Sequence, residues 1–266
     1  MILSSTVRRV LVALTGLVLL VMYLPLVVVV INSFNPSRTL TWPPTGVTLE
    51  WWRRAWESEG ARDAVVSSVE VAVASTVIAL VLGTLMSLAL QRYRFFGKSS
   101  VNLLVILPIA LPGIVTGIAL NNAFRGILGI QLGILTVIVA HATFCIVTVF
   151  NNVQARLRRM GGSFEEASAD LGAGVWTTFR LVTFPQLRSA LLAGGLLAFA
   201  LSFDEIIVTT FTAGAGTTTL PIWILNNLFR PNQAPVVNVV AVVLILVSIL
   251  PIWLAQKLSG DTEALR

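Results

Sequence analysis

The chain has 266 residues, of which 56% are hydrophobic and only 11% are charged, and its mean hydropathy is +0.89. A water-soluble protein of this length cannot cover so much apolar surface, whereas a bilayer can, so the composition excludes a soluble enzyme or a soluble binding protein. A net charge of +6 is compatible with nucleic-acid binding, but the placement of the basic residues between long apolar stretches is better explained by membrane topology, and we expect no nucleic-acid partner.

Six stretches are long and apolar enough to cross a membrane, because a spanning helix needs about 20 apolar residues. In chain order they are Val10–Ile31, Ala64–Leu90, Val101–Phe124, Ile130–Phe150, Ser189–Phe211 and Val236–Leu254. These runs are continuous rather than alternating, which predicts helices and not the strands of a barrel. The sequence therefore predicts an all-α polytopic membrane protein, with about six transmembrane helices in one lipid-embedded domain over residues 1–266.

The basic residues predict the orientation of these helices. With the N-terminus in the cytoplasm, twelve of the 18 Lys and Arg residues fall on the cytoplasmic side and six on the opposite side. This bias agrees with the positive-inside rule and predicts that both termini are cytoplasmic. The first apolar run is longer than that of a signal peptide and is followed by no small-x-small cleavage site, so we expect it to remain as an anchor.

The segment between the first two spans, residues 32–63, is predicted to be extracytoplasmic and carries an aromatic cluster. The cluster consists of Trp42, Trp51, Trp52 and Trp56, and Pro43 and Pro44 follow Trp42. Such a cluster is typical of the membrane–water interface, and a docking surface for an extracytoplasmic partner is the alternative interpretation.

The third and fourth spans contain the next informative residues. The third is predicted to be kinked or partly unwound, because it carries Pro108, Pro112, Gly113 and Gly117. Transporters place such breaks at the substrate path, but Pro also produces purely structural kinks, so both interpretations stay open.

His141, in the fourth span, is the only histidine of the chain, and it has no carboxylate at helical spacing. It therefore predicts an interhelical hydrogen bond rather than a metal ligand, and we expect no metal site. Cys145 of the same span is expected to be a small apolar core residue.

The segment at residues 151–188, between the fourth and fifth spans, is predicted to be cytoplasmic. A capping-box pattern predicts a helix over Ser163–Leu171 that stops at Gly172, a residue suited to a left-handed turn. A second short helix is predicted over Val175–Leu181, ending before Pro185. The pair is either an interfacial hairpin or an element that docks a partner.

The same segment resembles the EAA signature of ABC importer permeases, which is E-A-A, three residues, G, nine residues, then I-x-L-P. Here the corresponding residues are Glu166-Ala167-Ser168, Gly172 and Val182-Thr183-Phe184-Pro185, and the departures at Ser168, Val182 and Phe184 are mild. In that family the loop is the coupling helix, which sits in a groove of the cytoplasmic ATPase. The resemblance assigns this role to Glu166, Ala167, Asp170, Leu171 and Gly172.

The resemblance extends to Leu107–Gly113 and to Phe203–Ile207, and it is closest to the second permease subunit of spermidine/putrescine-type importers. It implies a type I ABC importer permease fold in the bacterial inner membrane. The implied partners are a homologous second permease, two cytoplasmic ATP-binding subunits and an extracytoplasmic solute-binding protein. ATP hydrolysis then belongs to other subunits, so we expect neither enzymatic activity nor a cofactor here. Consistent with this, Gly97-Lys98-Ser99 lacks the upstream glycine of a phosphate loop.

Three acidic residues lie within the predicted spans, and no Lys or Arg lies there to pair with them: Glu70, Asp204 and Glu205. A charge in a span costs about 2.5–3.5 kcal/mol on insertion scales, which makes each one a candidate for the path of a cationic substrate. On a continuous helix Glu205 would share a polar stripe with Thr209, whereas the resemblance also gives weight to Asp204, so both are kept. Alternatively, one or both cap a helix break or pair with the partner permease. Glu70 follows two serines that predict a helix start close to water.

These residues predict an importer of putrescine, spermidine or a related small cation. The same fold with ferric iron, sulfate, phosphate, thiamine or a peptide as cargo is the first alternative, and the absence of basic residues from the spans argues against the anions. A secondary transporter that works without an ATPase is the second alternative. The EAA loop and the lack of an inverted repeat argue against it.

Overall fold

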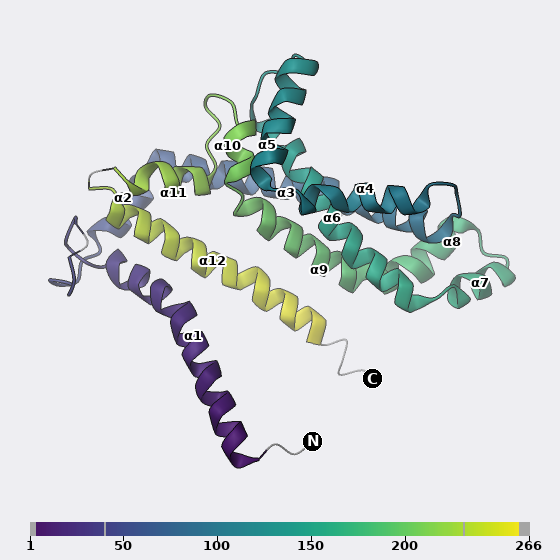
Figure 1. The fold of residues 1–266 in the computed structure, drawn as a ribbon, viewed down its shortest axis with the longest axis horizontal. Coiled ribbons are helices and arrows are strands. Elements are labelled where there is room, and N and C mark those ends of the chain that lie inside the picture. Colours follow the sequence, from purple (N-terminus) through teal and green to yellow (C-terminus); the bar gives the residue numbers. More distant parts are fainter. Residues whose placement is uncertain (1–3, 40, 231, 261–266) are drawn as a thin grey trace. The chain divides into compact units, whose positions relative to one another are not determined.

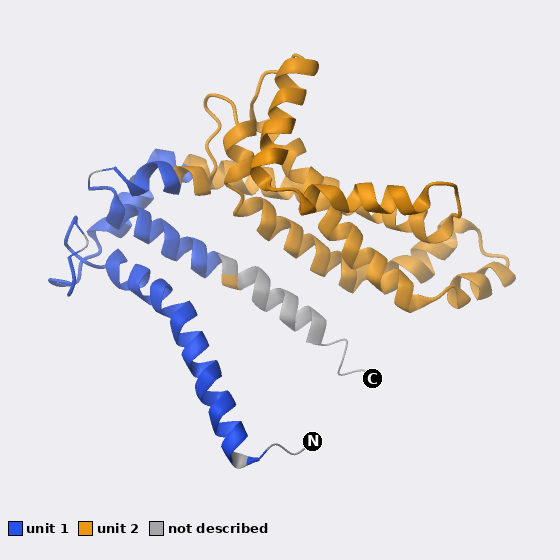
Figure 2. Cartoon of the chain, in the orientation of Figure 1, with its two compact units in different colours: residues 1–62, 224–247 blue, residues 63–223, 248–266 orange. Residues whose placement is uncertain are grey.

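The computed structural model of the chain describes residues 4–39, 41–230 and 232–260, and the regular structure within these ranges is entirely helical. The described chain forms two compact units (Figure 2), residues 1–62 with 224–247 and residues 63–223 with 248–266. The elements in chain order (Figure 1) are α1 (Ser5–Ser33), α2 (Glu50–Glu57), α3 (Glu59–Arg92), α4 (Lys98–Ala110), α5 (Gly113–Asn122), η1 (Ala123–Ile127), α6 (Ile134–Met160), α7 (Ser163–Asp170), α8 (Val175–Thr178), η2 (Phe179–Thr183), α9 (Phe184–Phe203), α10 (Ile207–Thr212), α11 (Leu220–Leu228) and α12 (Ala234–Gly260).

Four described helices are long and apolar enough to cross a membrane, and one bent pair passes the same test together, as a broken span or a re-entrant loop. The four run over Thr6–Ser33, Glu59–Arg92, Ile134–Met160 and Val175–Phe203, and the pair is α4 with α5 and η1, bent by 105°. The kink predicted for the third span is thereby confirmed. The sixth predicted span falls within α12, whose described apolar stretch is Ala234–Val247, so its full crossing stays a prediction.

The first unit contains α1, which is apolar after Arg8 and Arg9, with none of its most apolar window buried. After α1 the chain folds back on itself at Asn35, whose side chain is fully buried and donates to the Thr41 carbonyl at 3.0 Å. The Trp51 indole donates to the Asn35 carbonyl at 2.8 Å. Trp51 of the predicted aromatic cluster therefore belongs to the core of its own loop, whereas Trp42 and Trp56 are exposed.

In the second unit, α3 and α6 run parallel and approach closely through small residues. Ser75 and Ser87 of α3 donate from their hydroxyls to the α6 carbonyls of Ile138 and Phe150, at 2.9 and 3.0 Å. Between them, a Cβ added to Gly83 would lie 2.9 Å from the Ile146 carbonyl oxygen. Small residues permit this close backbone approach, which is how helices associate where no hydrophobic effect drives them together.

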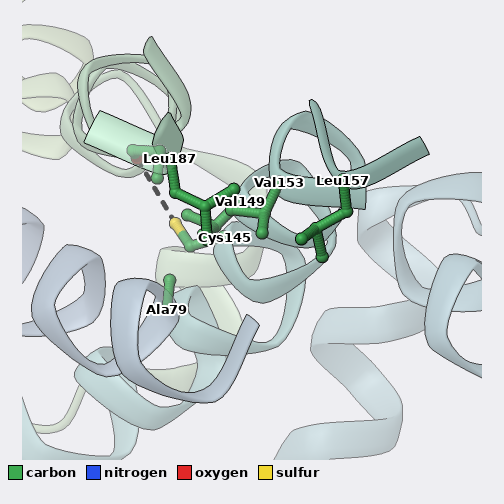
Figure 3. Packing of buried hydrophobic residues seen from close by; sticks show 7 residues of the cluster. Ala79, Cys145, Val149, Val153, Leu157 and Leu187 are labelled. Atoms are coloured by element: carbon green, nitrogen blue, oxygen red, sulfur yellow. Dashed lines mark hydrogen bonds between the residues drawn. The ribbon is translucent and has the colours of Figure 1, made fainter. Parts of the chain in front are cut away.

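Helix α9 packs antiparallel to α6 and also approaches α3, and α6 and α9 lie side by side in Figure 1. The core between α3, α6 and α9 is built from Ala79, Cys145, Val149, Val153, Leu157, Leu187 and Ala198 (Figure 3). Cys145 is fully buried there, and its thiol donates to the Ala198 carbonyl at 3.3 Å. The prediction that it is a core residue is confirmed.

Several local predictions are wrong. The second predicted span begins at Glu59 rather than Ala64, because α3 continues into the preceding segment. The capping box does not form: Gly162, and not Ser163, is the N-cap of α7, and no side chain caps it. The second short helix does not end before Pro185, because α8 passes through the π-helical turn η2 into α9, where Pro185 occupies the first turn and needs no N–H partner.

Candidate functional site

Two regions of the second unit hold most of the candidate coupling and substrate-path residues that the sequence singled out. One is the loop that carries α7, and the other is the interruption between α9 and α10. Both lie where the main chain leaves regular α-helix, which is where irregular backbone is tolerated and used in membrane transporters.

The loop begins and ends at glycines with positive φ. Gly161 has φ of 68° and Gly172 has φ of 78°. A Cβ on Gly172 would meet nothing within 4 Å, so the backbone conformation, and not the available space, favours glycine there. Around it the N–H of Gly172 donates to the Ala169 carbonyl and the N–H of Ala173 donates to the Ser168 carbonyl. These two bonds close α7 as the sequence predicted.

Helix α7 has two distinct faces. The residues that the resemblance assigns to coupling are all exposed: Glu166, Ala167, Asp170, Leu171 and Gly172. Leu171 is 89% exposed, so its side chain contributes little to the packing of this chain. The opposite face holds Ser168, whose hydroxyl lies 2.9 Å from that of Thr178 in α8.

That inner face also holds Glu165, a residue that sequence analysis missed. Its carboxylate lies 2.6 Å from the Arg92 guanidinium at the end of α3, and it accepts a 2.6 Å hydrogen bond from the Thr183 hydroxyl at the end of η2. Partial burial raises the pKa of Glu165, but the hydrogen bonds from Arg92 and Thr183 and the charge of Arg92 outweigh it, so the pKa is lower than usual. Glu165 is therefore ionised at neutral pH. Glu165 and Glu166 are neighbours in the sequence, but on a helix their carboxylates point to different faces, and only Glu166 belongs to the EAA-like pattern.

The second region is a helix break that sequence analysis placed inside a continuous span. Helix α9 ends at Phe203, and α10 starts at Ile207. The continuous stripe expected for Glu205 and Thr209 is therefore wrong. Instead, the Glu205 carboxylate accepts from the free N–H of Val208 at 2.8 Å and satisfies the first turn of α10. The helix-break alternative holds for Glu205.

Asp204 differs from its neighbour. Its backbone N–H closes α9 on the Ala200 carbonyl, while its side chain is exposed. Within the described ranges no hydrogen bond or ion pair occupies its carboxylate. Of the two acids at the break, Asp204 is thus the one available to another molecule.

His141 joins the two sides of the break from α6. Its Nδ1 lies 2.8 Å from the Ser202 hydroxyl in α9, and its Nε2 lies 2.9 Å from the Thr209 hydroxyl in α10. The Thr209 hydroxyl donates to the Glu205 carbonyl at 2.9 Å, so it must accept from Nε2–H, and Nδ1 accepts from Ser202. The predicted interhelical hydrogen bond is confirmed. Thr209 is fully buried, so within this chain it supports the break rather than presenting a free hydroxyl.

Helix α5 and a second contact from α6 also hold α10 in place. A Cβ on Gly117 of α5 would lie 2.8 Å from the Phe211 ring, so the two helices touch at that glycine. At its end, α10 receives hydrogen bonds from α5 and α6: Asn121 donates to the Phe211 carbonyl and Thr136 to the Thr212 carbonyl. The bend of the third span and the break of the fifth therefore meet.

Glu70 lies apart from this network in the described residues. It is exposed on α3, and the nearby Ser68 hydroxyl accepts from the N–H of Leu220 rather than starting a helix. The expected helix start at these serines is wrong, because α3 begins eleven residues before Glu70, at Glu59. No group of His, Cys, Asp and Glu in the described residues could hold a metal ion.

Comparison with known proteins identifies the family. A family model described as the inner membrane component of binding-protein-dependent transport systems matches residues 75–262. The chain belongs to this family. It is a permease subunit of an ABC importer in the inner membrane, as the EAA-like loop predicted.

Two relatives match nearly the whole chain. The spermidine/putrescine transport system permease protein PotC of Escherichia coli (strain K12) is 33% identical over 241 residues, which cover 90% of each chain. The putrescine transport system permease protein PotI of the same strain is 32% identical over 244 residues, covering 89% of this chain and 85% of PotI.

The fold is also similar to a solved structure, a chain of a bacterial ABC transporter involved in the import of the acidic polysaccharide alginate. The TM-score is 0.73 with 16% identity, over 98% of this chain and 99% of the other. At this identity the similarity concerns the fold alone, and it confirms the predicted permease architecture.

Proposed function

We propose that this permease forms half of the path of an ATP-driven importer for putrescine, spermidine or a related small cation. The observation that carries the cargo is the exposed carboxylate of Asp204 at a helix break, in a chain about one-third identical to two polyamine permeases. A carboxylate replaces part of the hydration shell of an ammonium group and compensates its charge.

The four acidic and hydroxyl residues singled out by the sequence have different proposed tasks. Asp204 contacts the cation directly. Glu205 and the buried Thr209 hold the break so that Asp204 stays presented, since both are engaged by hydrogen bonds within the chain. Glu70, exposed on α3, adds negative charge along the route.

The proposed machinery has the 151–188 loop and both termini in the cytoplasm. The exposed face of α7, with Glu166, Ala167, Asp170, Leu171 and Gly172, docks on one of two ATP-binding subunits. A homologous second permease completes the path, and a solute-binding protein delivers the cargo from outside. ATP binding opens the cavity outward, and hydrolysis, which occurs on those other subunits, resets it.

The test is uptake of radiolabelled putrescine and spermidine by a transport-deficient strain that expresses the whole system. We expect ATPase-dependent uptake by the wild type, its loss in the double variant Asp204→Asn/Glu205→Gln, and normal uptake by the control Asp63→Asn. Asp63 is an exposed acid at the start of α3, so this control removes one negative charge away from the break.

Uptake that persists without the ATPase subunits would contradict an ABC mechanism. No uptake of either polyamine by the wild type, with the complex assembled, would contradict the cargo and leave the family assignment standing.

A further inference from the structure

Three residues far apart in the sequence meet behind α7. The Arg92 Nη2 lies 2.6 Å from the Glu165 Oε1 and donates to the Thr183 hydroxyl at 3.3 Å. Thr183 in turn donates to the same carboxylate oxygen at 2.6 Å. The three side chains form a closed triangle that links the end of α3, the first turn of α7 and the end of η2. We call this triangle the clamp.

The clamp is better protected than an ordinary surface ion pair. The side chains of Arg92 and Glu165 are 29% and 26% exposed, and Thr183 is fully buried. Exposed pairs contribute little because water and salt screen them, whereas a charge-assisted, partly buried arrangement with a third hydrogen bond is stronger and geometrically fixed. The clamp therefore positions α7 as well as stabilising the fold.

The main chain alone connects α7 to α9 weakly. Between α7 and α8 the chain turns at residues 171–174, which include Gly172 and Gly174, and the helix that begins at Val175 then continues through the π-helical turn η2 (Phe179–Thr183) into α9. On the other side, Gly161 and Gly162 separate α7 from α6. A push on the exposed face of α7 would be absorbed by these joints unless side chains bridge them.

We propose that Arg92, Glu165 and Thr183 are positioning residues that make α7 move as one body with the end of α3 and the start of α9. A displacement of α7 is then delivered to two membrane helices at once. This inference rests on the proposed coupling of α7 to an ATPase, and it assigns the force-transmitting contacts to residues other than the five that the resemblance assigns to coupling. The second link, between Ser168 and Thr178, keeps α8 in the same body.

The test uses the full transporter reconstituted in liposomes with its binding protein, and it measures polyamine uptake and ATP hydrolysis together. For Glu165→Gln and Arg92→Met we expect uptake per ATP hydrolysed to fall about fivefold or more, while the ATPase subunits still copurify. The charge-swapped double variant Arg92→Glu/Glu165→Arg is expected to recover most of the ratio. The control is Arg180→Met, which removes an exposed cation of η2 that forms no ion pair within the described residues.

Thr183→Val keeps the shape of the buried side chain, so it tests the clamp even where the charge variants fail to fold. It removes the two sides of the triangle that Thr183 makes but leaves the Arg92–Glu165 ion pair, so we expect a smaller fall in the same ratio. Unchanged uptake per ATP in Thr183→Val and both single charge variants would overturn the clamp, and so would a fall that the charge swap leaves uncorrected. Failure of the wild type to import polyamines would instead contradict the cargo. The clamp is then judged from the stimulation of ATP hydrolysis by the binding protein, which the variants should weaken.

Discussion

The clamp behind α7 and the network at the α9–α10 break both join three elements, but they use different chemistry. The clamp uses charges, Arg92 and Glu165, in a loop where each side chain keeps about a quarter of its surface exposed. The network around His141 uses neutral groups: His141, Ser202 and Thr209 are almost completely buried and satisfy one another with single hydrogen bonds, while the Glu205 carboxylate beside them caps α10. A charged group costs little free energy beside water and much more inside a membrane protein, so each network matches its surroundings.

The largest effect is expected at the break. His141→Ala leaves a cavity and removes the partners of two buried hydroxyls, so we expect a loss of about 3–5 kcal/mol of unfolding free energy together with loss of uptake. SDS-induced unfolding of the purified permease measures it. His141→Gln retains a donor and an acceptor and should lose less. Thr143→Ala, which removes a hydroxyl bonded only within α6, is the control. Equal stability of His141→Ala and Thr143→Ala would contradict the network.

A smaller effect is expected where α5 touches α10. Gly117→Ala places a methyl group 2.8 Å from the Phe211 ring, which forces the helices apart at a cost of about 1–3 kcal/mol. Gly126→Ala is the matched control, because a Cβ at Gly126 would meet nothing within 4 Å. The same unfolding assay compares them. If both substitutions are neutral, the two interruptions do not depend on this contact.

Sequence reasoning predicted the bend of the third span and the α7 loop, but it predicted neither the break between α9 and α10 nor the clamp. The bend of the third span was predictable because Pro112 cannot continue a helix hydrogen-bond ladder. The break at residues 204–206 contains neither Pro nor Gly and lies in an apolar run, so the hydropathy pattern predicted one continuous span across it. The α7 loop was recognisable from glycine spacing, but the clamp was not, because 73 residues separate Arg92 from Glu165 and nothing in a single sequence pairs them.

Glu205 offers a way to separate structural from functional acids. Glu205→Ala leaves the Val208 N–H without its acceptor, and loss of such a cap costs about 0.5–2 kcal/mol. Asp204→Asn removes no hydrogen bond of the described chain, so its unfolding curve should match that of the wild type. Thermal unfolding followed by tryptophan fluorescence tests the pair. Destabilisation by Asp204→Asn and not by Glu205→Ala would reverse the roles assigned here.

The smallest effect concerns pH. Because the pKa of Glu165 is lowered in the folded chain from its ordinary 4.5, the ionised clamp contributes stability above about pH 4.5. That contribution is lost as the pH falls through the lower folded value. The difference in Tm between the wild type and Glu165→Gln should therefore be constant from neutral to mildly acidic pH and shrink in stronger acid. A difference that grows on acidification would show that Glu165 is not held ionised by Arg92.

The most direct test of the central claim compares Asp204→Asn with Glu205→Gln in the concentration dependence of putrescine uptake. Gln at position 205 can still accept from the Val208 N–H, so we expect it to retain most uptake. Asp204→Asn should raise the KM for putrescine about tenfold or more, since it removes the carboxylate that meets the cation. If Asp204→Asn transports like the wild type while Glu205→Gln does not, the exposed carboxylate at the break is not the substrate contact.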